Sequence, residues 1–394
     1  MAHVVLAGGG TAGHTSPLIA TAERITGSDQ SGSVVAVGTS KGLETTVVPA
    51  AGLRLELIPP VPLPRTLTVD LLKVPWRLID SVRQARRILK REGADVAVGF
   101  GGYVSLPVYL AARTMGIPVV IHEQNALPGL ANKVAARFAR LVAVSFPDTP
   151  LPHAEYLGLP LRSGIAQLDV EARRADARTG FGLDADRPTL LVSGGSQGAQ
   201  SINTATLGAR DELLAAGVQI LHVLGPKNIA ASDVVVTDDV SGARYVPLGY
   251  VDAMEDAYAA ADLMVGRSGA GTVMETAAVG LPVLFVPLPH GNGEQARNAT
   301  FLVDGGAARL IDNADFDAAR MAREVRALFD DPDALPAMRR AGRDLVPPDA
   351  AGRLAERVLA IAAPSGAAAS GPGRSGQKSS PARSGSGRFT KGRS

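Results

Sequence analysis

Cysteine is absent from the sequence. Its absence excludes a disulfide framework, a thiolate metal site and a catalytic thiol, and it fits a reducing compartment. Long hydrophobic runs are also absent: the longest, such as residues 281–288, fall well short of the ~20 residues that a membrane-spanning helix needs. No basic segment followed by an apolar one precedes the strand-like residues at the start, so we expect no secretory signal. The chain should be soluble or peripheral to a membrane.

Acidic residues are absent from residues 364–394, which hold six lysines and arginines among 7 glycines, 8 serines and 3 prolines. The net charge of +2 therefore divides into +6 for this tail and −4 for the rest of the chain. Such a composition cannot bury a core and predicts a flexible extension. The tail is either a solvated extension without a specific function or a segment attracted to an anionic surface.

The rest of the chain has the composition of a globular protein. Hydrophobic residues make up 46% of the sequence, and 394 residues at roughly 100–200 per domain predict two or three domains. Short apolar runs alternate with amphipathic ones, which indicates parallel sheets with helices on both faces. The expected strands lie at residues 3–7, 34–37, 96–98, 119–122, 142–144, 189–192, 220–224, 245–247, 263–265 and 283–286.

One pattern occurs twice: an apolar strand runs into a glycine-rich turn and then a helix, at residues 3–14 and again at residues 189–199. Two copies predict two doubly wound, Rossmann-like α/β domains that join near residues 160–165. We expect an N-terminal domain of residues 1–162 and a C-terminal domain of residues 163–345. Because ligands of open parallel sheets bind at the carboxyl ends of the strands, the domains should face one interdomain cleft.

The two glycine-rich turns have more than one interpretation. Glycine lets the backbone approach an anion closely, and the helix that follows offers free N–H groups. Glycine can equally serve only tight packing between strand and helix. Residues 8–13 also fit the letters of a dinucleotide-binding fingerprint, but that fingerprint needs an acidic residue after the second strand. Residues 38–41 read Gly-Thr-Ser-Lys instead, which disfavours a dehydrogenase.

A third glycine-rich turn, residues 266–272, precedes a helix that carries Glu275. A carboxylate on the first turns of that helix can accept both hydroxyls of a ribose while the turn holds a diphosphate. The simpler interpretation is an acid that offsets the helix dipole. One strand later, Gln295 and Asn298 share a helix face and offer amides suited to sugar hydroxyls. The order of these features indicates a nucleotide-sugar pocket.

These motifs resemble those of glycosyltransferases with GT-B architecture, and specifically the family that adds N-acetylglucosamine to lipid I in peptidoglycan synthesis. The resemblance runs from Ala7 to about residue 310 and leaves out the tail. It rests on four strings in the expected order: residues 99–105, 122–125, 194–199 and 267–270. The chain departs from the family pattern at Ala12, where glycine is usual, at Glu294, where glutamine is usual, and at Leu159, where asparagine is usual.

The resemblance implies a fold, substrates and site residues. It implies a GT-B fold, a final helix within residues 346–363 that crosses back to the first domain, and no cofactor or metal. The positions that match donor contacts are Arg162, Ser196, Val251, Ala270, Gly271, Thr272, Glu275 and Gln295. The N-terminal positions that match groups closing over the donor sugar are Thr11, Ala12, Gly13 and Asn125. The positions that match polar residues of the acceptor side or the chemistry are His14, Tyr103, His122, Glu123 and Asn132.

The implied reaction moves N-acetylglucosamine from UDP-N-acetylglucosamine to the 4-hydroxyl of the muramoyl sugar of lipid I, with inversion, to give lipid II. Inverting transfer needs a base for the acceptor hydroxyl and stabilisation of the departing diphosphate. His14 can serve as the base at neutral pH; Glu123 is the rival, and His14 can also be purely structural. Asp331 and Asp333 spell a possible metal motif, but they lie between two helical patterns and are expected to form a turn and an N-cap.

The implied acceptor is a membrane lipid, so the chain should carry a docking surface. Residues 71–79 place Trp76 among apolar groups beside Lys73 and Arg77, and three more arginines follow by residue 87. This pattern is typical of an interfacial helix, or of an amphipathic helix packed on the sheet. We expect a peripheral enzyme on the cytoplasmic face of the cell membrane, with an anionic membrane surface and cell-wall synthesis proteins as partners and no nucleic acid. A sugar-nucleotide epimerase and an inactive nucleotide-sugar-binding module are the alternative functions.

Overall fold

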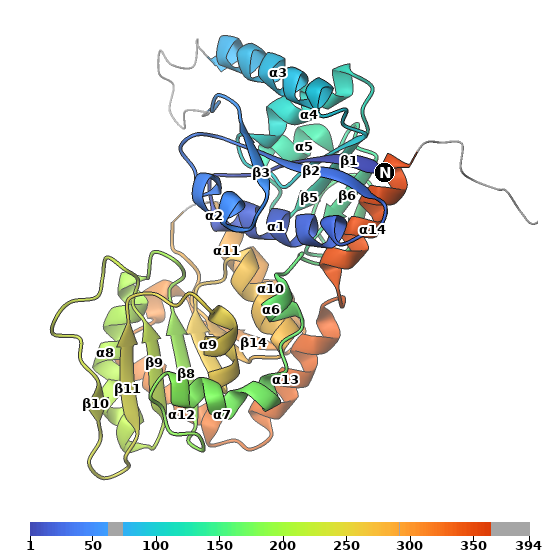
Figure 1. Ribbon diagram of the computed structural model, residues 1–394. Coiled ribbons are helices and arrows are strands. Elements are labelled where there is room, and N and C mark those ends of the chain that lie inside the picture. Colours follow the sequence, from blue (N-terminus) through green and yellow to red (C-terminus); the bar gives the residue numbers. More distant parts are fainter. Residues whose placement is uncertain (62–73, 291, 364–394) are drawn as a thin grey trace, which may run out of the picture.

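The computed structural model describes residues 1–61, 74–290 and 292–363. It contains two parallel sheets of seven strands each, one in each half of the chain, with helices packed on both faces (Figure 1). This architecture confirms the predicted fold class of two doubly wound α/β units. The basic tail, residues 364–394, and residues 71–73 of the expected interfacial segment lie outside the described residues.

The N-terminal sheet has the strand order β3-β2-β1-β4-β5-β6-β7, which reverses between β1 and β4. Its strands are β1 (Ala2–Ala7), β2 (Ser31–Gly38), β3 (Arg54–Leu57), β4 (Val96–Gly99), β5 (Val119–Glu123), β6 (Leu141–Val144) and β7 (Ala154–Tyr156). The helices of this half are α1 (Ala12–Thr26), α2 (Glu44–Ala50), α3 (Val74–Arg91), α4 (Ser105–Thr114) and α5 (Leu130–Ala135). The central strands are buried on both faces, as their continuous apolar runs require.

The C-terminal sheet has the order β10-β11-β9-β8-β12-β13-β14, and only β10 is antiparallel. Its strands are β8 (Thr189–Ser193), β9 (Gln219–Val223), β10 (Val236–Thr237), β11 (Arg244–Leu248), β12 (Leu263–Gly266), β13 (Val283–Phe285) and β14 (Ala308–Leu310). The order again reverses between the first strand of the half, β8, and its partner β12. Each half therefore has one topological switch point, where open α/β sheets bind ligands.

The helices of the second half cover both faces of its sheet. They are α6 (Ser163–Ala166), α7 (Val170–Gly180), α8 (Gln200–Ala215), α9 (Met254–Ala260), α10 (Ala270–Val279), α11 (Glu294–Asp304), α12 (Ala318–Phe329) and α13 (Ala334–Leu345), with a 3-10 turn at Asn313–Asp315. Asp333 is the N-cap of α13, and Asp331 accepts a hydrogen bond from its N–H at 3.0 Å. The predicted turn and N-cap at this acidic pair are confirmed.

The last helix, α14 (Ala350–Ala362), leaves the second half and packs on the first (Figure 1). It lies against α1, β1 and β4, and Leu354, Val358 and Leu359 join the apolar core of the N-terminal half. Ion pairs of Arg24 with Asp349 and of Arg357 with Glu155 hold its two ends. The chain therefore crosses between the halves twice.

The sequence analysis missed four strands: β3, β7, β10 and β14. Each of them forms an edge of its sheet. They have only two to four residues, and most of those residues are partly or fully exposed. Edge strands are half solvated and short, so they lack the continuous apolar run that marked the central strands.

Candidate functional site

Glycine-rich loops follow the two central strands of each sheet. In the first half they follow β1 and β4, which pair in register from Val4 with Val96 to Ala7 with Gly99. In the second half they follow β8 and β12, which pair from Leu190 with Leu263 onward. Four loops therefore lie at the two switch points, and the register sets the two loops of each pair beside one another.

The loop after β1 turns sharply at Gly10, whose φ is +87°, and α1 begins two residues later at Ala12. The left-handed conformation falls on Gly10, and Ala12 does not have a positive φ. The alanine is therefore accommodated without strain where the related family usually has glycine. Thr11, Ala12 and Gly13 are exposed at the start of the helix. Their position at a helix N-terminus is suited to a partly negative ligand.

His14 lies on the first turn of α1, half-buried, with its Nδ1 atom 3.0 Å from the Thr11 hydroxyl. The backbone of Gly101 and Gly102, from the loop after β4, lines the other side of its ring. Burial lowers the pKa of His14 below its ordinary value, although a hydrogen bond with the Gly9 carbonyl and the charge of Glu44 oppose that shift. The imidazole is therefore neutral at physiological pH and able to accept a proton.

Glu44, which the sequence analysis did not single out, holds this loop through a hydrogen bond with Gly10. Its side chain is fully buried. One carboxylate oxygen accepts the Gly10 N–H at 2.8 Å, and the other accepts the N–H and hydroxyl of Thr39, both at 2.9 Å. Burial raises the pKa of Glu44, but these hydrogen bonds outweigh burial and hold the pKa below its ordinary value. The group is therefore a carboxylate at neutral pH.

Glu123, at the end of β5, organises the loop that follows it. Its two oxygens accept hydrogen bonds from the N–H groups of Asn125 and Gly129 and from the Asn132 side chain, at 2.9–3.0 Å. The side chain is 3% exposed, and burial raises its pKa against the effect of those hydrogen bonds. Since both oxygens are occupied, Glu123 is better placed to hold the loop of residues 124–129 than to receive a proton.

His122 and Asn132 lie in the interior of the first half. His122 is fully buried, with Nε2 2.9 Å from the Gly158 carbonyl, and burial lowers its pKa to about 4. Asn132 is 1% exposed and also bonds the Tyr109 hydroxyl. Both residues match acceptor-side positions in the sequence, but in the structure they support the site from the core. Tyr103, in contrast, is 52% exposed and free to meet an acceptor.

In the second half, the loop after β8 carries Ser196, which is exposed. Gly194 packs against the Ala199 backbone, and Gly198, at φ +73°, packs against the Leu224 carbonyl so closely that any side chain there would overlap it. The loop is thus fixed by backbone packing. It lies beside the loop after β12, at the C-terminal switch point.

The loop after β12 is held by Arg267. This partly buried guanidinium donates hydrogen bonds of 2.8–3.0 Å to the carbonyls of Val286 and Pro287 and to the side chains of Asn313 and Ser201. The loop leads into α10 through Gly269, and the first N–H groups of that helix belong to Ala270, Gly271 and Thr272. Such N–H groups lack partners within a helix and suit a diphosphate.

Glu275 lies one turn further along α10. Its Oε2 accepts the Tyr258 hydroxyl at 2.7 Å, so α9 fixes its orientation. Burial raises its pKa, while the Tyr258 hydrogen bond and the charge of Arg162 lower it. Arg162 is exposed, and Val251 is buried just before α9. Arg162 therefore lies near enough to affect the pKa of Glu275, and Val251 belongs to the same apolar core as the buried face of α10.

The start of α11 meets the first half directly. Asn298 is fully buried; its oxygen accepts the Ala126 N–H at 2.9 Å, and its amide group lies 3.2 Å from the Asn125 side-chain oxygen. Gln295 accepts the Leu288 N–H at 2.9 Å and so fixes the loop before the helix. Burial raises the pKa of Glu294, and the charge of Glu123 raises it further. The loop of residues 124–129 thus meets the second half at this helix.

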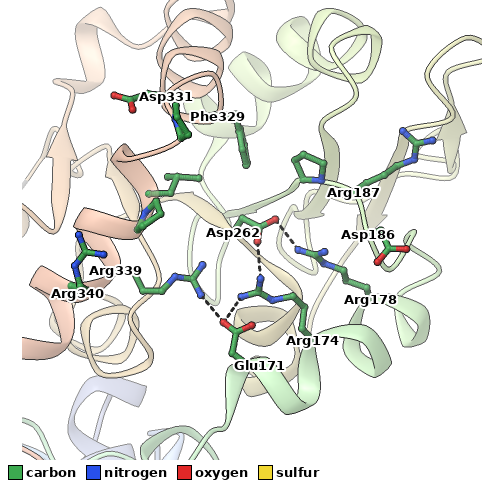
Figure 2. Close-up of a pocket in the computed structure, with 14 residues that line it drawn as sticks. Glu171, Arg174, Arg178, Asp186, Arg187, Asp262, Phe329, Asp331, Arg339 and Arg340 are labelled. Atoms are coloured by element: carbon green, nitrogen blue, oxygen red, sulfur yellow. Dashed lines mark hydrogen bonds and ion pairs between the residues drawn. The ribbon is translucent and has the colours of Figure 1, made fainter.

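A cavity of about 570 Å³ lies elsewhere, next to Pro188 and Asp262, which precede β8 and β12 (Figure 2). It is therefore at the amino ends of the strands, opposite the glycine loops. Glu171 pairs with Arg174 and Arg339, and Asp262 pairs with Arg174 and Arg178. Alternating charges satisfy one another, so we interpret this cluster as a network that ties α7 to α13. In the described part of the chain no acidic or histidine cluster could hold a metal ion.

Comparison with known proteins gives one consistent result. Residues 4–144 match the glycosyltransferase family 28 N-terminal domain, and residues 189–351 match its C-terminal domain. The chain is 61% identical, over 92% of its length and 98% of the relative's, to the UDP-N-acetylglucosamine--N-acetylmuramyl-(pentapeptide) pyrophosphoryl-undecaprenol N-acetylglucosamine transferase of Cutibacterium acnes.

Two solved structures extend the comparison. MurG of Acinetobacter baumannii superposes with a TM-score of 0.73 and 29% identity, covering 91% of this chain and all of that one. A UDP-GlcNAc 2-epimerase from Neisseria meningitidis, bound to UDP-GlcNAc, superposes with a TM-score of 0.64 at 12% identity, over 91% of this chain and all of that one. At that identity the second likeness concerns the fold alone.

Proposed function

The chain belongs to glycosyltransferase family 28, and from this premise we infer that it transfers N-acetylglucosamine from UDP-N-acetylglucosamine to lipid I, giving lipid II for peptidoglycan synthesis. It is an inverting hexosyltransferase with GT-B architecture. The observation that carries this conclusion is the near full-length match to the Cutibacterium acnes transferase. The pairing of a helix N-terminus with Glu275 agrees with it, since that pairing suits a sugar nucleotide.

We propose that the second half, residues 163–345, binds the donor. Ala270, Gly271 and Thr272 would hold the diphosphate through backbone N–H groups, Ser196 would close over it, and Glu275 would accept the ribose hydroxyls. The uracil would lie near Val251 and Arg162, and Gln295 would meet the sugar. As the bond to the sugar breaks, the diphosphate gains charge, and preorganised N–H groups at the start of α10 stabilise it. This chemistry needs no metal or cofactor.

The first half, residues 1–162, would present the acceptor and the base. We assign the base to His14, because its ring is neutral at physiological pH, half-buried and attached to an exposed loop. The acceptor 4-hydroxyl would give its proton to His14 as its oxygen attacks the anomeric carbon opposite the diphosphate. Thr11, Ala12, Gly13 and Asn125 would close over the sugar, Tyr103 would contact the acceptor, and Glu123, His122 and Asn132 would support the loop from beneath.

Radiolabel transfer tests the function directly. Label from UDP-N-acetylglucosamine should appear in a lipid I analogue, with one UDP released for each sugar transferred. Conversion of the labelled sugar nucleotide to an epimer without any acceptor would instead support an epimerase. Tight donor binding without UDP release in the presence of acceptor would support a binding module.

We further propose that the enzyme works at an anionic membrane surface on the cytoplasmic side. No helix in the described ranges could cross a bilayer. Helix α3 lies at the outer end of the first half, away from the second half (Figure 1). It buries Ala85, Ile88 and Leu89 against the protein yet leaves Trp76 75% exposed, and its basic residues line a shallow cavity of about 260 Å³: Arg83, Arg86, Arg87 and Lys90. An exposed tryptophan beside cations suits a lipid interface.

Vesicle co-sedimentation tests this surface. Trp76→Ser should weaken binding to vesicles containing phosphatidylglycerol, and the parent protein should bind neutral phosphatidylcholine vesicles less tightly than anionic ones. Val240→Ser is the matched control, because Val240 is 97% exposed in the second half, far from α3. If both variants bound anionic vesicles as tightly as the parent protein does, α3 would not be part of the membrane-binding surface. Pull-down of cell-wall synthesis proteins is a separate experiment and bears on the partners alone.

A further inference from the structure

Glu44 is enclosed in a way that its helix does not explain. It is the first residue of the seven-residue helix α2, where an acid commonly points to solvent. Here it points inward, and Gly9, Gly38 and Gly42 pack around it so tightly that a Cβ on any of them would overlap the Glu44 side chain. Three glycines from different segments thus form a cradle that fits one carboxylate.

The hydrogen bond from Gly10 to Glu44 fixes a whole peptide unit. The Gly9 carbonyl and the Gly10 N–H belong to one planar trans peptide, so they point in opposite directions. With the N–H directed at Glu44, the carbonyl is directed away from it, toward the side of the His14 ring, and the carbonyl raises the pKa of that ring. A Cβ on Gly102 would lie 2.8 Å from the Gly9 oxygen and 3.6 Å from His14 Nδ1, so the two atoms line the same small space.

We propose that Glu44 is a positioning residue for His14 and acts through the Gly9–Gly10 peptide. The Glu44 carboxylate would act on the His14 imidazole through the intervening peptide, as a directly bonded carboxylate does in a catalytic triad. It would fix the orientation of the ring and determine which nitrogen carries the proton. Gly10 needs such an anchor, because a glycine at positive φ has many other accessible conformations. This inference rests on the proposed role of His14 as the base.

The charge of Glu44 gives the proposal a second, independent signature. Of the described groups around the imidazole, the Thr11 hydroxyl and the Gly101–Gly102 backbone are uncharged, and Glu44 is the charged group that acts on the pKa of the ring. A carboxylate near the ring favours its protonated form. Glu44→Gln removes that charge while keeping the shape of the side chain. The pKa of His14 should fall in this variant, and the acidic limb of the kcat/KM profile should move to lower pH.

A double-mutant cycle tests the coupling. Glu44→Gln should lower kcat about 10- to 100-fold when His14 is present and change it less than about twofold in the His14→Ala background. The dissociation constant of UDP, which would contact only the second half, should stay unchanged throughout. Thr39→Val is the matched control: it removes one hydrogen bond from the same carboxylate but leaves the Gly10 bond in place. Glu44→Asp keeps the charge and serves if the glutamine variant fails to fold; it should leave the His14 pKa near that of the parent protein.

Each outcome decides something. Equal losses of kcat in both backgrounds would mean that Glu44 acts on the fold in general, and the proposal would fail. A kcat within twofold of the parent in the Glu44→Gln enzyme would also overturn it. If His14→Ala itself kept full activity, the base assignment would fall instead. The link between Glu44 and the ring would then still be decided by NMR titration of His14, where an unchanged pKa in Glu44→Gln contradicts it.

Discussion

In the first half of the molecule a carboxylate holds the loop after β1, whereas in the second half a guanidinium holds the loop after β12. Both loops follow a central strand at a switch point, and both lead into a helix. Glu44 accepts a loop N–H, so it removes a donor from the cleft. Arg267 donates to neighbouring carbonyls and side chains, so it leaves the helix N–H groups available.

The difference matches the two tasks of an inverting transferase. A loop that presents a base gains from a rigid peptide and a nearby negative charge, because that charge favours proton acceptance by the base. A loop that receives a diphosphate gains from free N–H groups and a nearby positive charge. Substitutions in the first half should therefore change kcat, and those in the second half should change donor affinity.

Removal of the imidazole should have the largest effect. His14→Ala should lower kcat about 10²- to 10⁴-fold, the usual contribution of a positioned general base, with little change in the dissociation constant of the donor. Steady-state kinetics and a donor titration measure both quantities. His153→Asn is the control, since His153 is exposed and has a positive φ that asparagine tolerates. Full kcat in His14→Ala would contradict the assignment of the catalytic base to the first half.

Loss of the Glu275 carboxylate, which is proposed to bind the ribose, should lower donor affinity more than kcat. Glu275→Gln weakens a hydrogen bond to a charged group, worth about 1.5–3 kcal/mol, so donor affinity should fall roughly 10- to 150-fold while kcat changes far less. Isothermal titration with UDP measures the affinity without turnover. Glu171→Gln, the same substitution in the distant ion-pair network, should leave affinity unchanged. A selective loss of kcat in Glu275→Gln would contradict the comparison.

The pH profile should sharpen the assignment in the first half. Burial holds the pKa of His14 below its ordinary value of 6.5, so the ring stays neutral, and active as a base, until the pH falls below that value. The acidic limb of kcat/KM should therefore lie below pH 6.5, with activity lost as the pH falls through the lowered pKa. A limb at or above pH 7 would point to a different base.

Deletion of residues 364–394 should have the smallest effect on sugar transfer. The proposed roles of the two loops use none of the six cations of this segment, so transfer to a water-soluble lipid I analogue should stay within about twofold of the parent. Binding to anionic vesicles should weaken, by up to ~1 kcal/mol for each cation near the surface. Unchanged vesicle binding would make the tail a solvated extension and leave α3 as the proposed membrane contact.

The sequence predicted the central strands and the glycine loops because both leave local patterns. Ten apolar runs correspond to the ten interior strands of the two sheets, and glycine marks the turns at their carboxyl ends. The edge strands lack such runs. Doubly wound topology follows from the repeated pattern, since right-handed crossovers allow few other arrangements.

The residues that hold these loops in place could not be predicted from local sequence patterns. Glu44 at the start of a helix looks like an ordinary dipole-compensating acid, and nothing nearby in the sequence reveals that three glycines enclose it. Asn298 was expected to meet a sugar, but it also bonds Asn125 and Ala126, about 170 positions earlier. Contacts of this kind depend on how distant segments meet, and periodicity carries no information about that.

The return of α14 to the first half has a consequence for synthesis on the ribosome. The N-terminal sheet is complete once β7 has emerged, yet Leu354, Val358 and Leu359 are needed to finish its core. Roughly 200 residues separate the two, so at about 5–20 residues per second the unfinished apolar face waits on the order of 10–40 s. The half that is translated first is thus completed last, and during that interval part of its apolar core remains exposed to water.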